Sequence, residues 1–144
     1  MITFRILGLI AKLNLPDDSS ETPQILEAGQ GLRVEGWDKD ENFDDRLGSN
    51  KANSLGLFEI QFTDEDFRQE DRELEGLPDI FFRVYRGSQL LGDTQGEEGQ
   101  QILWNTAIVS SAPQLLNRMT NGEGQPLRVG ATDYYIAAWG WIVP

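Results

Sequence analysis

The sequence contains no histidine and no cysteine. Without histidine, the chain lacks the usual general base and the usual ligand for transition metals, and no Ser-His or Cys-His catalytic pair can form. Without cysteine, disulfides, thiolate nucleophiles and cysteine-based zinc sites are excluded. Acid-base catalysis would have to rest on carboxylates, lysine or tyrosine alone. We therefore expect a protein that is not an enzyme.

Basic residues are also scarce. The chain has 12 Lys and Arg against 24 Asp and Glu, which gives a net charge of -12. Binding to nucleic acid or to an anionic membrane begins with basic residues near phosphates. This balance therefore predicts no nucleic-acid partner, and no binding to anionic membranes without Ca²⁺. A metal ion or a cationic partner is compatible with it, and so is a surface charge that only keeps the protein soluble.

Long apolar runs are missing too, since no segment is long enough to span a bilayer. The apolar stretch 1–15 is interrupted by Thr3, Arg5 and Lys12. It lacks the leading basic cluster and the small-residue cleavage site of a signal peptide. We expect synthesis in a cytoplasm without a signal peptide, with later export as part of an assembly as an open alternative.

Short segments that alternate between apolar and polar residues are abundant and predict β-strands. The clearest is 57–62, where Glu59 and Gln61 should be exposed, and 80–85 is similar. Arg86-Gly87-Ser88 is typical of a hairpin turn, and the acidic residues after Thr63 favour one short helical turn near 64–70. We expect a single all-β domain over 1–144, an antiparallel β-sandwich. Its predicted core includes Phe58, Ile60, Phe62, Ile80, Phe82 and Val84.

Four aspartates follow the predicted strand 32–37 within eight positions: Asp38, Asp40, Asp44 and Asp45. A strand that runs into so many carboxylates leads into an exposed loop, because unpaired carboxylates are costly to bury. Two interpretations remain open. The loop is an oxygen-rich site for a hard cation such as Ca²⁺. Alternatively, Asp38 and Asp40 accept hydrogen bonds from backbone N–H groups and stabilise a turn.

The two terminal segments, 2–13 and 132–143, are apolar on both of their faces. A strand in a two-layer sandwich turns only one face to the core, so the other face needs a cover. We predict that protein partners or further copies of the chain supply it, by docking on Trp139, Trp141, Leu7 and Leu9. The alternative is a loop of the same chain, such as 110–124, folded over these faces.

From about residue 31 to 105 the chain resembles the transthyretin-like, or carboxypeptidase-regulatory-like, β-sandwich domains of bacterial Tc-type toxin-associated proteins. The resemblance rests on the order of several motifs: Val34 through Asp38 and Asp40, Asp44 to Gly48, Gly56 with Phe58 and Ile60, Phe67, Pro78 to Tyr85, Gly87, and Trp104-Asn105. It implies a transthyretin-like core flanked by the terminal strands. It also implies a non-catalytic structural module that docks onto proteins, such as a component of a large toxin or injection-type complex.

The acidic loop is also similar to a calcium-binding loop of C2 domains, in which Asp-x-Asp precedes a further Asp and an aliphatic residue with Gly. That resemblance implies Asp38, Asp40, Asp44 and Asp45 as Ca²⁺ ligands. Because Pro78-Asp79-Ile80 resembles a second C2 loop, Asp79 is a fifth candidate, and Ca²⁺ needs six to eight oxygens in all. The alternative function is therefore a Ca²⁺-dependent, C2-like binding module.

Overall fold

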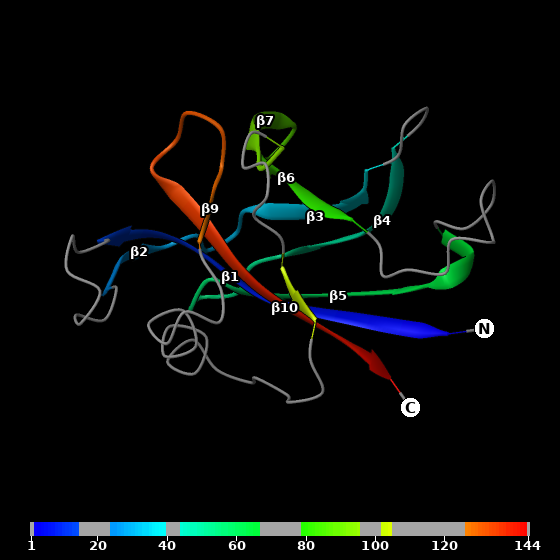
Figure 1. The fold of residues 1–144 in the computed structure, drawn as a ribbon. Coiled ribbons are helices and arrows are strands. Elements are labelled where there is room, and N and C mark those ends of the chain that lie inside the picture. The colour runs from blue at the N-terminus through cyan, green and yellow to red at the C-terminus, as the bar shows by residue number, and fades with distance from the viewer. Residues whose placement is uncertain are drawn as a thin grey trace.

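The computed structural model describes residues 2–14, 24–39, 44–66, 79–95, 102–104 and 126–143. Within these residues, the chain forms two β-sheets and one short 3-10 helix, η1 (Asp64–Asp66). Figure 1 shows the sheets as two layers, with β3 and β6 above β1, β5 and β10. Several parts of the predictions lie outside the described residues, namely Asp40, Phe67, Pro78, Asn105 and the loop 110–124.

The lower layer, sheet A, is built around β1 (Thr3–Asn14), the long apolar strand at the N-terminus. One edge of β1 pairs with β10 (Tyr134–Val143), so the two terminal segments lie antiparallel beside each other, with Thr3 opposite Val143. The other edge pairs with β5 (Leu57–Thr63) along its first part and with β2 (Gln24–Ala28) along its last part. Two further short strands border β10: β8 (Leu103–Trp104) and β9 (Leu127–Arg128).

The upper layer, sheet B, has the strand order β4-β3-β6-β7 in the described residues. Its strands are β4 (Asp45–Lys51), β3 (Arg33–Asp38), β6 (Ile80–Arg86) and β7 (Gln89–Asp93). All of its neighbours pair antiparallel. The turn between β6 and β7 contains Gly87 at a φ of 60°, the conformation that glycine adopts without steric cost.

The main hydrophobic core lies between the two sheets. Phe82 of sheet B is completely buried, and its ring meets Phe58 of sheet A edge to face with 5.8 Å between centroids. The six core residues predicted from the alternating strands are all buried: Phe58, Ile60, Phe62, Ile80, Phe82 and Val84. The all-β sandwich expected from the sequence is therefore confirmed, as is a helical turn within 64–70, at η1.

Three local features differ from expectation. Asp45, which was predicted to lie in the exposed acidic loop, is the first residue of the strand β4, although Gly48, Ser49 and Asn50 in this strand have low strand propensity. The short strand β8 runs parallel to β10, so the sandwich is not purely antiparallel. Glu59 is half-buried and forms an ion pair with Arg5 on the neighbouring strand, whereas Gln61 is exposed as expected.

A glycine turn connects β4 to β5 and carries the chain from sheet B to sheet A. Gly56 has a φ of 83°, and a Cβ atom there would lie 2.5 Å from the carbonyl oxygen of Ile10. The amide of Ile10 in turn donates to the carbonyl of Gly56 at 2.8 Å. The turn is thereby held against β1, and only glycine fits this position without strain.

Candidate functional site

The outer face of sheet A carries the docking residues predicted from the terminal strands. The register places Leu7 opposite Trp139 and Arg5 opposite Trp141, all on the face that points away from sheet B. Trp139 and Leu9 are each only 1% exposed and belong to a second apolar cluster with Ala11 and Leu13. Leu7 and Trp141 are half-buried. The role of all four as docking residues stays a prediction, although Trp139 and Leu9 offer little exposed surface to a partner.

Four of the five predicted calcium ligands are described, Asp38, Asp44, Asp45 and Asp79, and they lie at one end of sheet B. Asp38 lies opposite Asp45 on one side and Ile80 on the other. Asp38 is 8% exposed, and its Oδ1 accepts a hydrogen bond from the amide of Asp79 at 2.8 Å. Among the residues that the structure describes, no group of three acidic side chains is arranged to hold a metal ion. The Asp38 carboxylate thus joins the end of β3 to the start of β6, 41 residues further along the chain, and both the turn-stabilising and the calcium interpretations of the acidic loop stay predictions.

We expect Asp38→Ala to lower the free energy of unfolding by about 2 kcal/mol, because it leaves the Asp79 amide without this acceptor. The loss should be equal in calcium and in chelator, as measured by thermal melting. Asp38→Asn, which keeps an acceptor oxygen, should cost less. A calcium-dependent rise in stability, about 2.7 kcal/mol at a hundredfold excess over the dissociation constant, would instead support the metal site if Asp40→Asn abolished it.

A second surface, on the outer face of sheet B, is rich in arginine and aromatic side chains, and it was not predicted from the sequence. Side chains directly opposite each other in the register share a face of the sheet. Two cross-strand rows on the outer face are Lys51, Arg33 and Tyr85, followed by Ser49, Glu35 and Arg83. The third row is Arg46, Trp37 and Phe81. We call this surface the arginine–aromatic face and define it by Arg33, Glu35, Trp37, Arg46, Lys51, Phe81, Arg83 and Tyr85.

Guanidinium groups stack on the aromatic rings of this face. The Arg83 guanidinium carbon lies 4.1 Å from the centroid of the Trp37 ring, and that of Arg33 lies 4.2 Å from the Tyr85 ring. Trp37 also stacks on Phe81, with 6.3 Å between centroids and 19° between planes. Each such cation–π contact contributes about 0.5–1 kcal/mol at an exposed site and more where water is excluded. The stacking holds both arginines flat on the sheet.

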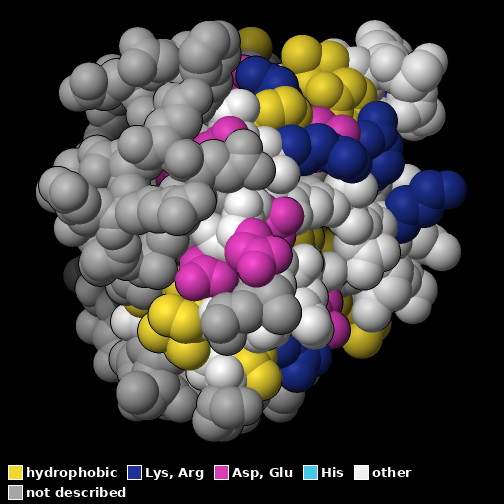
Figure 2. All heavy atoms as spheres, turned by 90° about the vertical axis from the view of Figure 1, so that its right-hand side faces the viewer, with side chains coloured by type: hydrophobic (Ala, Val, Ile, Leu, Met, Phe, Trp, Pro, Cys, Tyr) yellow, Lys and Arg dark blue, Asp and Glu magenta, His cyan; other side chains and the backbone are white. Residues whose placement is uncertain are grey.

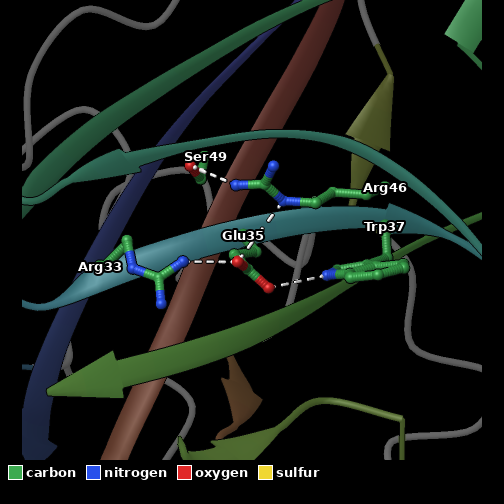
Figure 3. Close-up of polar contacts among 5 residues, drawn as sticks. All are labelled: Arg33, Glu35, Trp37, Arg46 and Ser49. Atoms are coloured by element: carbon green, nitrogen blue, oxygen red, sulfur yellow. Dashed lines mark hydrogen bonds and ion pairs between the residues drawn. The ribbon is translucent and has the colours of Figure 1, made fainter. Parts of the chain in front are cut away.

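Glu35 stands at the centre of the face and is 6% exposed. Figure 3 shows its carboxylate with Arg33 on one side, the Trp37 indole on the other and Arg46 above it. Glu35 Oε2 accepts from Arg33 Nη1 and lies 3.4 Å from Arg46 Nε, while Oε1 accepts from Trp37 Nε1 at 3.2 Å. Arg46 also donates to Ser49 Oγ at 2.9 Å. One carboxylate thus fixes two arginines and the indole.

The electrostatics of Glu35 follow from these contacts. Burial raises the pKa of its carboxyl, because the charged form loses water. The hydrogen bonds from Trp37 and Arg33 and the charges of Arg46 and Arg33 act in the opposite direction and prevail, so the pKa lies below its usual value. Glu35 is therefore ionised at neutral pH and serves as a fixed negative charge beneath the guanidinium groups.

The arginine–aromatic face is basic within an acidic chain. It holds Arg33, Arg46, Lys51 and Arg83, which are four of the 12 basic residues, against Glu35, the one acid among its defining residues. Asp93 lies opposite Arg83 on β7, on the same side of the sheet, and adds a second carboxylate at its border. Figure 2 shows Lys and Arg side chains next to hydrophobic ones along the top of the molecule, where sheet B lies. The chain as a whole has a net charge of -12, yet the arginine–aromatic face carries a local surplus of positive charge.

The sequence does contain a signal for this surface. If Ile80, Phe82 and Val84 point inward, as predicted, then Phe81, Arg83 and Tyr85 must point outward. Two aromatic residues and an arginine on the outer face of one strand are residue types that are enriched at protein interfaces. What the sequence cannot show is that β3 lies beside β6 and supplies Trp37 and Arg33 to the same surface.

Comparisons with known proteins identify no relative that defines a family for this chain. No protein-family model matches it, and no match was found among curated proteins. Among solved structures, a 9R-lipoxygenase from Cyanothece PCC8801 is similar, with 22% sequence identity and a TM-score of 0.35. The match covers 55% of this chain and 10% of the lipoxygenase chain. A likeness at this level carries no conclusion about function.

In the described residues, no helix has the length and apolar character needed to cross a membrane.

Proposed function

We propose that this chain is a non-catalytic module that docks onto a protein partner through the arginine–aromatic face. The observation that carries the proposal is the stacking of Arg83 on Trp37 and of Arg33 on Tyr85 across two neighbouring strands. Tyr, Trp and Arg are the residue types most enriched among the side chains that dominate binding energy at protein interfaces. Here they gather on one side of a sheet whose other side is core.

The face is also prepared for binding before a partner arrives. The ion pairs and the hydrogen bond of Glu35 hold Arg33, Arg46 and Trp37 in place. Ordering a long side chain on binding costs about 0.5–1.5 kcal/mol, so groups that are already ordered lose less. A rigid platform of this kind suits recognition better than it suits solubility, for which mobile charged side chains suffice.

Two features of the sequence support a docking role over catalysis. Histidine and cysteine are absent, which leaves few groups for acid-base or nucleophilic chemistry at neutral pH. The resemblance of residues 31–105 to transthyretin-like domains of toxin-associated proteins favours a structural module within a larger assembly. The proposal moves the docking surface from the terminal strands to sheet B, because Trp139 and Leu9 are buried.

Selection from a random peptide library displayed on phage tests the proposal. The folded chain should enrich peptides that no longer bind after Arg83→Glu or Tyr85→Ser, two changes on the surface of β6. Arg128→Glu, on β9 of sheet A, makes the same charge change away from the face and should leave binding intact. Melting curves verify that each variant is folded. Enriched peptides that bind all variants equally would place docking elsewhere and would refute this surface.

A further inference from the structure

We infer that the arginine–aromatic face takes an extended, carboxylate-bearing segment of its protein partner, an inference that rests on the proposed docking function. The central group is Arg83. Its guanidinium stacks on Trp37 and lies 5.5 Å from the centroid of the Phe81 ring. Within the part of the chain that the structure describes, this guanidinium makes no hydrogen bond and no ion pair. It is held in position with its N–H groups available.

Stacking leaves the edge of a guanidinium open, and that edge is the part that recognises carboxylates. A planar guanidinium offers two parallel N–H groups that fit the two oxygens of a carboxylate. Because the ring occupies the flat side of Arg83, these donors point along the surface or outward from it. An aromatic platform under an arginine therefore favours an acidic side chain over a neutral amide, which provides one acceptor and no charge.

The spacing of the arginines matches an extended polypeptide. Arg33 and Arg83 are diagonal neighbours on adjacent strands, since Arg33 pairs with Tyr85 and Arg83 pairs with Glu35. Diagonal neighbours in a sheet lie about 7–8 Å apart. Alternate residues of an extended chain repeat every ~6.6 Å and point the same way. Acidic residues at every second position of a bound segment can therefore reach both guanidinium groups.

Charge decides among the possible occupants. A second copy cannot present the same face to this one, because both would carry a surplus of positive charge. Nucleic acid extends beyond a small patch and would meet the rest of a chain with a net charge of -12. A membrane would need apolar side chains that insert, yet Phe81 is only 3% exposed and Trp37 is bonded to Glu35. A short acidic segment is small enough to contact only the arginine–aromatic face and to avoid the acidic remainder of the surface.

The test is a fluorescence anisotropy titration with labelled peptides of alternating Asp and Gly, and with matched peptides of alternating Asn and Gly. We expect the Asp peptide to bind and the Asn peptide to bind at least about tenfold more weakly, the value of one charge-assisted contact. Arg83→Gln should weaken binding of the Asp peptide by about tenfold, and added salt should weaken it further. Arg128→Gln, the control on β9, should have no effect beyond a small change in salt dependence.

Each other outcome overturns the inference in a distinct way. Equal binding of the Asp and Asn peptides, lost in Arg83→Gln, would leave docking intact but refute acidic specificity. Peptides that bind equally to the parent and the Arg83→Gln chain would show that the arginine–aromatic face is not the binding surface, and they would refute the proposed function as well. Stronger Arg83-dependent binding to phosphatidylserine vesicles or to single-stranded DNA would replace the acidic peptide by a lipid or nucleic-acid ligand. Concentration-dependent self-association abolished by Arg83→Gln would make a second copy the occupant.

Discussion

Phe82→Ala is expected to lower the free energy of unfolding by about 4 kcal/mol, because it opens a cavity between the two sheets. Phe82 is completely buried and packs edge to face on Phe58 from sheet A. The amide of Phe82 donates to Thr94 Oγ1 at 3.0 Å, and this backbone contact survives the change. The loss therefore reports side-chain packing between the sheets. Urea denaturation followed by tryptophan fluorescence or circular dichroism measures it.

Leu90→Ala provides the control for this prediction. Leu90 is 50% exposed on the edge strand β7, so its truncation should change stability by no more than about 0.5 kcal/mol. The contrast between the two positions tests whether the core lies where the sandwich places it. A loss below about 1 kcal/mol for Phe82→Ala would mean that this ring is not packed between two sheets.

The sequence predicted those parts of the fold that depend on local periodicity. Alternation of apolar and polar residues identified β5 and β6 and their buried residues, because one-sided burial forces a period of two. The motif Arg86-Gly87-Ser88 also predicted a hairpin turn, which the structure places between β6 and β7 with Gly87 at a φ of 60°. These features are encoded within a few neighbouring residues, so a single sequence is enough to find them.

The sequence did not predict which strands lie next to each other in the sheets. β1 lies between β10 and β5, which start 131 and 54 residues after it along the chain. Such long-range partners depend on how the whole chain packs, and alternation within a strand does not choose among them. The same limit hid the ion pair of Arg5 with Glu59, which made Glu59 half-buried instead of exposed. It also hid the parallel pairing of β8.

The candidate site was partly encoded in the sequence. Each strand of the arginine–aromatic face has its own visible pattern, with Arg33, Glu35 and Trp37 at alternate positions of β3. The sequence indicated that the apolar outer face of the terminal strands needs a cover, but it could not show that Trp139 is only 1% exposed within the chain itself. Polar groups on a strand can therefore be found from the sequence, but their neighbours and their exposure require the fold.

Glu35→Ala is expected to lower the free energy of unfolding by about 3 kcal/mol, the second of the two large effects. The change removes a buried charge that pairs with Arg33 and Arg46, and it leaves Trp37 Nε1 without its acceptor. Removing one member of a buried, charged network costs more than the net value of the contacts, because the remaining groups stay desolvated. Glu35→Gln keeps an acceptor for Trp37 and should cost about half as much.

The pH dependence of stability separates the charge of Glu35 from its packing. Because the pKa of Glu35 is lowered by folding, its stabilising contribution is complete above the unfolded value of about 4.3 and is lost as pH falls through the folded value. The parent chain should therefore lose more stability than Glu35→Gln when the pH is lowered from neutral to about 3.

Glu59→Ala is the matched control, since Glu59 pairs with Arg5 on the outer face of the other sheet. There the side chains of Arg5 and Glu59 are 37% and 41% exposed, compared with 9% for Glu35. Water screens an exposed pair, so its removal should cost no more than about 1 kcal/mol. Equal losses for Glu35→Ala and Glu59→Ala in urea denaturation would show that Glu35 is screened as well. The arginines above it would then be mobile, and the rigid platform on which the docking proposal rests would not exist.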